Sequence, residues 1–165
     1  MDRPKNLRDE VALDGVDRLI LEQLQRDGRI TNAELAERVG VAASTCVARV
    51  RSLVARGAIT SFTARVDPSV VGRKLQVLVS VSLRSGARQR ITEFSDELRA
   101  LPEVQQLFFL GGVEDFIVHL AVRDSDHVRD FVVEHLSAHP AVSSTRTSIV
   151  FSHHQNPTHV DASGS

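Results

Sequence analysis

The segment TNAELAERVGVAASTCVARVRSLVARG, residues 31–57, decides the fold of the first half of the chain. Thr31 and Glu34 form a capping box, in which each side chain satisfies a backbone amide at the start of a helix, and Gly40 ends that helix. After a turn of three residues a second helical pattern follows, with apolar residues at helical spacing: Cys46, Val50 and Leu53. Two helices joined by so short a turn predict a helix-turn-helix.

Another helix is predicted upstream of this segment. Asp14 can cap it, and its apolar residues repeat at helical spacing until Gly28: Val16, Ile20 and Leu24. Downstream, residues 59–66 are rich in β-branched residues and phenylalanine, which predicts a wing or connecting strand. We therefore predict a helix-turn-helix DNA-binding domain over residues 11–66 and a linker at 67–74.

The second half has the pattern of an α+β domain. Val77, Val79, Val81 and Leu83 share one face of a strand predicted at 75–83. The elements predicted after it are a helix at 91–101, strands at 104–110 and 115–122, a helix capped by Ser125, and a strand at 142–151. LRALPEV at 98–104 returns as LSAHPAV at 136–142, so each copy closes a helix and opens a strand. The order βαββαβ predicts a ferredoxin-like domain over residues 75–151.

The predicted sheet leaves one face without helices. Both helices cover the other face, and the open face is expected to be too apolar as a whole to face water, because it carries Leu78, Ser80, Ile117, His119 and Ala121. A second subunit is the simplest cover, which predicts a homodimer. The ends of the chain are expected to be a flexible N-terminus at 1–10 and a disordered tail at 152–165.

Composition excludes several classes of protein. No apolar run approaches the roughly 20 residues of a membrane span, and the charged N-terminus lacks the apolar region of a secretory signal, so the cytoplasm is expected. The net charge is −1, but six arginines face only two glutamates between residues 29 and 65. Cys46, the single cysteine, is expected to be a buried thiol in the core.

The second helix of the motif supplies candidate DNA contacts, because base edges in a groove are read by hydrogen bonds from polar side chains. Opposite its apolar stripe lie Ser44, Thr45, Ala48, Arg49, Arg51 and Ser52. One chain supplies few cations for phosphate neutralisation, so we expect a dimer on a roughly palindromic site in double-stranded DNA.

Together these motifs resemble the Lrp/AsnC family of transcription regulators. The resemblance covers roughly residues 11–151. It is carried by LD at 13–14, DR at 17–18, IL at 20–21, LQRDGRI at 24–30, NAELA at 32–36, STCVARV at 44–50, GAI at 57–59, TARVDP at 63–68, LPEV at 101–104 and TRTS at 145–148. The chain departs from the family at Ala42-Ala43, where a serine cap is usual, and at Ala48, where arginine is common. Ser44 is the predicted substitute cap.

The resemblance implies that the second domain binds an effector, usually an amino acid, near a G-x-x-D turn at an interface between dimers. Here that turn and its neighbours give a predicted effector set: Gly112, Val113, Glu114, Asp115, Phe116, Thr145 and Thr147. Glycine lets backbone amides approach a carboxylate, and Asp115 can receive an ammonium, so Asp115→Ala is expected to abolish only the response to effector. The resemblance also implies dimers assembled into tetramers or octamers.

Several alternatives stay open on the sequence. The turn at Gly112 also fits an ordinary hairpin, and the chain also fits an effector-independent architectural DNA-binding protein of the same family. His135 and His139 have a metal-ligand spacing, but Pro140 ends their helix and no third ligand is evident. No catalytic motif is visible, and the strand at 75–83 lacks the aromatic residues of an RNA-binding sheet. We expect no enzyme activity, no metal and no cofactor.

Overall fold

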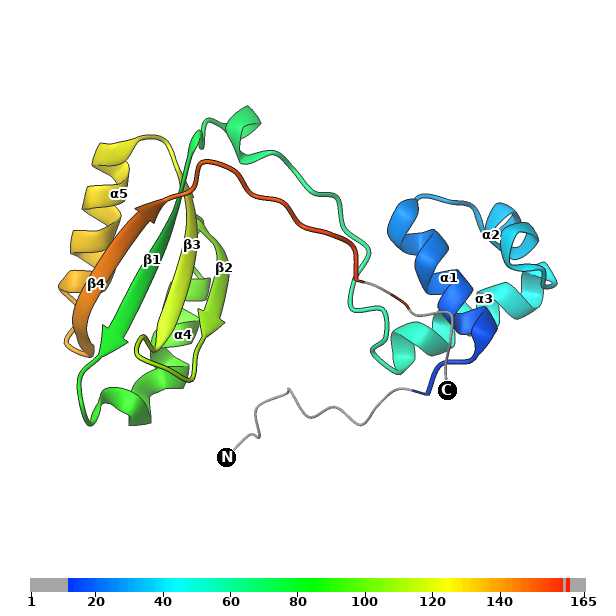
Figure 1. Cartoon of the computed structure of the whole chain (residues 1–165), viewed down its shortest axis with the longest axis horizontal. Coiled ribbons are helices and arrows are strands. Elements are labelled where there is room, and N and C mark those ends of the chain that lie inside the picture. Colours follow the sequence, from blue (N-terminus) through cyan, green and yellow to red (C-terminus); the bar gives the residue numbers. More distant parts are fainter. Residues whose placement is uncertain (1–11, 159, 161–165) are drawn as a thin grey trace. The chain divides into compact units, whose positions relative to one another are not determined.

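A computed structural model describes residues 12–158 and 160 and divides the chain into two compact units (Figure 1). The second, which we call the sheet unit, is Arg65–His154. The helical unit is the part of the described chain that precedes it. The predicted flexible N-terminus at 1–10 lies outside the described residues, as do positions 159 and 161–165 of the predicted tail.

The helical unit contains α1 (Gly15–Arg26), α2 (Asn32–Val39) and α3 (Ala43–Ala55). The Asp14 carboxylate caps α1 by accepting a hydrogen bond from the backbone N–H of Asp17 at 2.8 Å. Both bonds of the predicted capping box of α2 are present. The helices pack around a core of Ile20, Leu35, Ala36, Val39, Cys46 and Leu53. The predicted helix-turn-helix and the buried thiol are confirmed.

Two local predictions in this unit are wrong. Residues 59–66, all of which the structure describes, form no strand. A strand needs a partner for its backbone groups, and the helices that precede this segment offer none. Ser44 does not cap α3, because the cap position is Ala42 and Ser44 lies in the first turn of the helix.

The turn between α2 and α3 depends on Gly40, which caps α2 with φ +73° and ψ 34°. A Cβ at this position would contact nothing, so the cost of Gly40→Ala comes from the left-handed backbone alone and is expected to be about 1 kcal/mol. Gly15→Ala, in the first turn of α1 and equally free of contacts, is the control and should raise the stability slightly. Thermal unfolding of both variants checks this, and equal melting temperatures would contradict it.

The sheet unit has the predicted βαββαβ order. Its strands are β1 (Leu75–Leu83), β2 (Val104–Phe109), β3 (Phe116–Val122) and β4 (Val142–Ile149), and they form one antiparallel sheet in the order β2-β3-β1-β4. The helical segments are α4 (Ile91–Arg99), preceded by the short η2 (Ala87–Arg90), and α5 (Ser125–Phe131), which continues as the π-helical η3 (Val132–Ser137). A further short helix, η1 (Pro68–Val71), lies in the predicted linker. The ferredoxin-like fold is confirmed.

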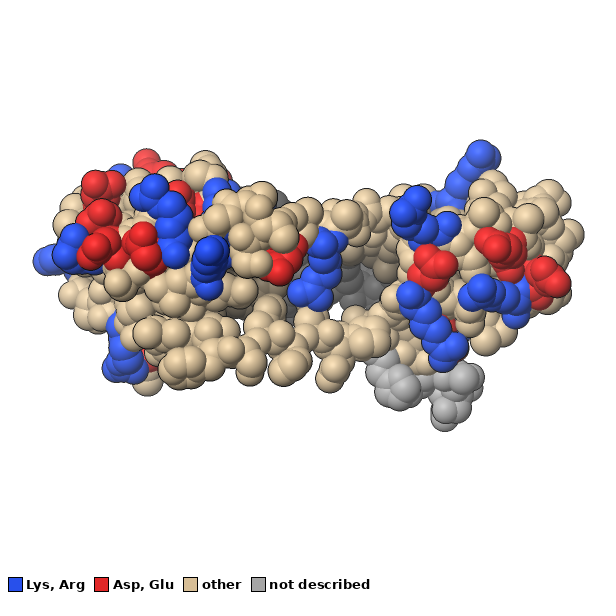
Figure 2. Space-filling model, turned by 90° about the horizontal axis from the view of Figure 1, so that it is seen from above, with Lys and Arg blue, Asp and Glu red and all other residues tan. Residues whose placement is uncertain are grey.

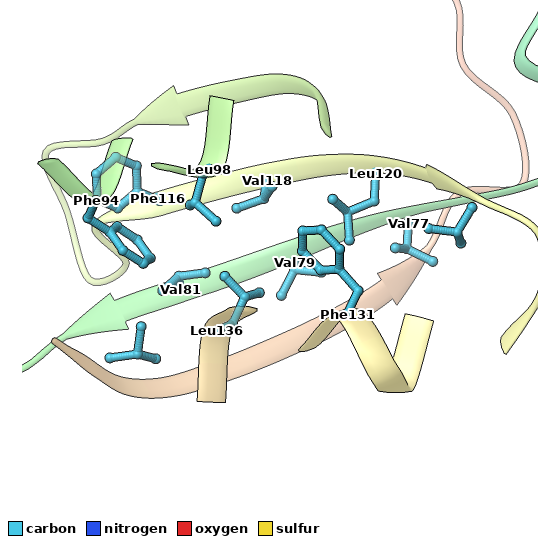
Figure 3. Packing of buried hydrophobic residues seen from close by; sticks show 12 residues of the cluster. Val77, Val79, Val81, Phe94, Leu98, Phe116, Val118, Leu120, Phe131 and Leu136 are labelled. Atoms are coloured by element: carbon cyan, nitrogen blue, oxygen red, sulfur yellow. The ribbon is translucent and has the colours of Figure 1, made fainter. Parts of the chain in front are cut away.

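One face of the sheet is buried under α4, α5 and η3 (Figure 3). Val77, Val79 and Val81 of β1 point to this face, where Phe94 packs edge-to-face on Phe116 with ring centroids 5.5 Å apart. Leu98 and Leu136, which occupy equivalent positions in the internal repeat, are both buried here. The cap of α5 differs from the prediction: Asp124, not Ser125, accepts the hydrogen bond from the backbone N–H of His127.

The open face carries the predicted residues but exposes fewer of them than expected. The strand pairing places Leu78, Ser80, Ile117, His119 and Ala121 opposite the helix-covered face. His119 and Ala121 are nevertheless buried within the chain. The His119 ring packs against His153, and its Nε2 lies 3.0 Å from Gln76 Oε1. Burial lowers the pKa of His119, with a smaller contribution from His153. The exposed apolar part is formed by Leu78 and by Phe108 of β2.

Candidate DNA-binding surface and effector turn

One side of α3 forms a continuous polar surface. Five of the six predicted DNA contacts are exposed there: Ser44, Thr45, Ala48, Arg51 and Ser52. They lie on the side opposite Cys46 and Leu53, which anchor the helix in the core. The small side chain of Ala48 lies among these hydroxyl and guanidinium groups. A surface of this kind can enter the major groove and offer donors and acceptors to base edges.

Arg49, the sixth predicted contact, lies elsewhere. Its guanidinium Nη1 donates to Asp14 Oδ2 at 2.5 Å and to Asp17 Oδ1 at 2.9 Å. The same residue is only half-exposed, whereas its neighbours on the polar side are open to solvent. Arg49 is therefore bound to the start of α1. Its Nη1 donates to these two carboxylates and not to a DNA phosphate.

The start of α3 has no side chain to cap it. Ala42 occupies the cap position with the extended backbone (φ −62°, ψ 145°) that serine adopts there, and no side-chain hydrogen bond is made to the first turn by any residue the structure describes. Ala42→Ser is expected to stabilise the helical unit by about 1 kcal/mol, because its hydroxyl can accept from the free backbone amides. Ala43→Ser, one residue inside the helix, is the control and should give no gain in melting temperature. Equal gains for both variants would contradict capping.

Charge on the helical unit is mixed in sign. Figure 2 shows arginine and acidic side chains interspersed over the face that it draws. Part of the arginine excess between residues 29 and 65 is engaged with acids, as in the Arg49–Asp14 pair and the Arg56–Asp17 pair. Both arginines thus add less to a field that attracts DNA than the sequence count suggests. Arg51 is an exposed cation on the polar side of α3.

The predicted effector turn lies between β2 and β3. Asp115 is 8% exposed, and its Oδ2 accepts a hydrogen bond from the backbone N–H of Leu83 at 2.7 Å. Its own backbone N–H donates to the carbonyl of Val81 at 3.0 Å. The carboxylate therefore ties the turn to the end of β1, a structural role that the sequence did not predict. Val113, at the tip, is 89% exposed.

Gly111 and Gly112 begin this turn, and nothing in the described structure of the chain requires glycine at either position. Neither has the left-handed backbone that favours glycine, and a Cβ built on either would meet no atom within 4 Å in the described structure. Glycine is also used where another molecule approaches the backbone closely. The turn is therefore accessible at its backbone, as a binding site for a carboxylate requires.

The other predicted effector residues are not gathered around this turn. Phe116 is fully buried on the helix-covered face. Thr145 and Thr147 pair with Val81 and Val79 and so share that face, on the edge strand β4, with β1 between them and β3. Within one chain, the seven predicted residues thus do not line a single site.

Two charged residues near these sites were not predicted from the sequence. Arg146 of β4 reaches across the open face to Glu114, with Nη1 3.3 Å from Oε1. Asp17 of α1 is buried and contacts Arg49 and Arg56. The spacing of Arg49 and Arg56, seven residues or two helical turns, is a signal that both leave α3 on the same side.

The histidines considered for metal binding have other contacts. His139 Nε2 lies 3.3 Å from Glu97 and its ring packs on Phe94, while the ring of His135 packs on Phe131. Over residues 12–158 and 160, no cluster of three or more His, Cys, Asp or Glu side chains could hold a metal ion. The helices of this same part of the chain are all too short or too polar to cross a bilayer.

A helix-turn-helix with an exposed polar face, joined to a separate ferredoxin-like unit, defines a DNA-binding transcription regulator. Residues 13–54 match the AsnC-type helix-turn-helix domain, and residues 76–159 match the Lrp/AsnC ligand binding domain. The chain belongs to the Lrp/AsnC family.

Its relatives are named as regulators. The HTH-type transcriptional regulator AldR of Mycolicibacterium smegmatis is 47% identical over 150 residues, 91% of this chain and 87% of that protein. The leucine-responsive regulatory protein of Escherichia coli K12 is 37% identical over 138 residues, 84% of each protein. The crystal structure of MtbAldR has a TM-score of 0.79 at 40% identity and covers 93% of this chain and 100% of its own. A transcriptional regulator from Neisseria meningitidis, solved in complex with L-Met, has a TM-score of 0.81 at 33% identity. The match covers 89% of this chain and 95% of that one. This chain is a transcriptional regulator and not an enzyme.

Proposed function

We propose that this regulator binds a small effector, an amino acid, at the turn between β2 and β3, and that binding changes its oligomeric state and its affinity for DNA. The observation that carries the proposal is the pair Gly111 and Gly112, which neither the backbone conformation nor the packing of the chain explains. The similar regulator from Neisseria meningitidis is solved in complex with L-Met, so a regulator similar to this chain binds an amino acid. We propose that the protein acts in the cytoplasm without a tightly bound cofactor.

DNA recognition is assigned to the polar side of α3. Its exposed hydroxyls suit base edges and phosphates, and Arg51 suits a guanine or a phosphate. A single copy of this surface makes few phosphate contacts, so we propose that a homodimer binds a roughly palindromic operator in double-stranded DNA.

A second copy of the chain is the proposed cover for the open face of the sheet. Phe108 is 46% and Leu78 36% exposed on that face. Aromatic residues such as Phe108 are enriched in the buried centre of protein interfaces. Dimers that assemble further into tetramers or octamers would bring the turn of one dimer near residues of another. Analytical ultracentrifugation with and without amino acids tests this assembly.

The first experiment is a gel-shift titration. DNA from upstream of the gene and of its neighbours is titrated with protein, alone and with each common amino acid. Intrinsic fluorescence is a poor substitute, because the chain has no Trp and no Tyr. A retarded band that responds to one amino acid supports the proposal and names the effector. A band that responds to none contradicts the effector proposal and favours an architectural DNA-binding protein, and absence of specific binding contradicts the operator proposal.

Gly112→Ala tests whether the turn between β2 and β3 binds the effector or is an ordinary hairpin turn. Because an added Cβ meets nothing in the chain, the variant is expected to keep its stability and its DNA binding. The methyl group would obstruct a ligand held against the backbone, so a higher effector concentration should be needed for the same shift. An unchanged response would place the effector elsewhere.

A further inference from the structure

Asp17 is a buried acid in the helical unit whose two oxygens both face α3. The residue is 5% exposed. Its Oδ1 accepts from Arg49 Nη1 at 2.9 Å, and its Oδ2 accepts from Arg56 Nη2 at 2.9 Å. One carboxylate on α1 therefore binds two arginines, Arg49 and Arg56, that lie two helical turns apart along α3.

Both arginines also contact α1 or the residues before it. Arg49 Nη1 donates to the cap residue Asp14, and Arg56 Nη1 donates to the carbonyl of Ala12 at 2.7 Å. The pKa of Asp14 is lowered, first by the hydrogen bond from the backbone of Asp17 and then by Arg49, so this carboxylate stays charged. The contacts form one connected network rather than an isolated surface pair.

A network of this kind has a geometric effect that apolar packing lacks. Cys46 and Leu53 bury the inner side of α3, but apolar contacts are not directional and tolerate small rotations and slides of a helix. Charge-assisted hydrogen bonds to two fixed oxygens are directional. Only Asp17 is buried in this network, since the Arg49 and Arg56 side chains are 32% and 35% exposed, and ion pairs of either kind often add little net stability.

We propose that Asp17 is a positioning residue for DNA recognition, which sets the rotation of α3 through Arg49 and Arg56 and thereby controls sequence discrimination. Arg49 then acts within the protein and not as a contact to DNA. The inference rests on DNA recognition by α3. The ratio of affinities that the wild-type protein itself shows for specific and scrambled DNA tests sequence-specific binding separately, and Arg51→Ala tests whether α3 contacts the DNA.

The test compares Asp17→Asn, Arg49→Ala and Arg51→Ala with the wild type. Each protein is titrated, over a range of salt concentrations, with the duplex that the wild type selects from a random pool and with a scrambled duplex of the same composition. Asp17→Asn and Arg49→Ala are expected to lower the ratio of the two affinities about tenfold, roughly the loss of one base contact, with an unchanged salt dependence. Arg51→Ala, on the exposed side, should reduce the slope of log affinity against log salt by about one if it contacts a phosphate.

Two results would overturn the proposal. A folded Asp17→Asn protein with the wild-type ratio would reduce Asp17 to a stabilising residue, and a loss of about one in the salt slope of Arg49→Ala would make Arg49 a phosphate contact. If Asp17→Asn does not fold, the triple variant Asp17→Leu, Arg49→Met, Arg56→Met replaces the network with apolar side chains, an exchange that proteins often tolerate. The proposal requires that this variant keep the wild-type thermal stability but have a lower ratio of affinities for the selected and the scrambled duplex. A wild-type ratio in this variant would refute the proposal.

Discussion

Ala48→Glu is expected to weaken DNA binding by at least about a hundredfold, since like charges placed together at an interface cost several kcal/mol. Ala48 is exposed at the centre of the polar side of α3, opposite Cys46. A glutamate there would bring a negative charge toward phosphates and toward the acceptor groups of bases. Glutamate forms helices well, so the change should leave the thermal stability close to that of the wild type.

Two matched variants separate the possible causes. Ala48→Gln has nearly the same size as Ala48→Glu without its charge, and it should lose much less affinity. Ala100→Glu adds the same charge at an exposed position in the sheet unit and should bind DNA nearly as the wild type does. Gel shifts at one fixed salt concentration measure all three proteins. If Ala48→Glu binds as tightly as Ala100→Glu, α3 is not the helix that enters the groove.

Local signals in the sequence were sufficient for most of the fold. The capping box at Thr31 and the αL glycine at position 40 act within a few residues, so their prediction required no tertiary information. The repeat that ends at Val104 and Val142 placed the starts of β2 and β4 correctly. The strand prediction for residues 59–66 was wrong because it depended on tertiary information. A segment rich in β-branched residues forms a strand only where a partner strand is available.

The candidate sites were less predictable, because they depend on contacts distant in sequence. The pairing of Arg49 with Asp17 joins positions 32 residues apart, and no local pattern specifies such a contact. Phe116 could have been assigned correctly, because it alternates in phase with Val118 and Leu120, which face the core. The separation of Thr145 from the turn at Gly112 follows from the strand order, which places β1 between β4 and β3.

Asp115→Ala is expected to destabilise the sheet unit as well as to remove any response to effector. The carboxylate is buried and accepts the backbone N–H of Leu83, so alanine leaves that donor without its partner, at a cost of roughly 1 to 3 kcal/mol. A loss of this size lowers the melting temperature of a domain by several degrees. Differential scanning calorimetry measures it, and an unchanged melting temperature would contradict a structural role for Asp115.

Asp115→Asn distinguishes that structural role from a role in binding the effector. Its side-chain carbonyl can still accept from Leu83, so its stability should stay closer to the wild type than that of Asp115→Ala. It carries no charge, and a site that holds the ammonium group of an amino acid on Asp115 would lose most of its affinity. A stable Asp115→Asn protein that has lost its response would show that the carboxylate binds the effector. If the response persists, the contribution of Asp115 is to hold the turn against β1, and the ammonium group must be bound by another acceptor.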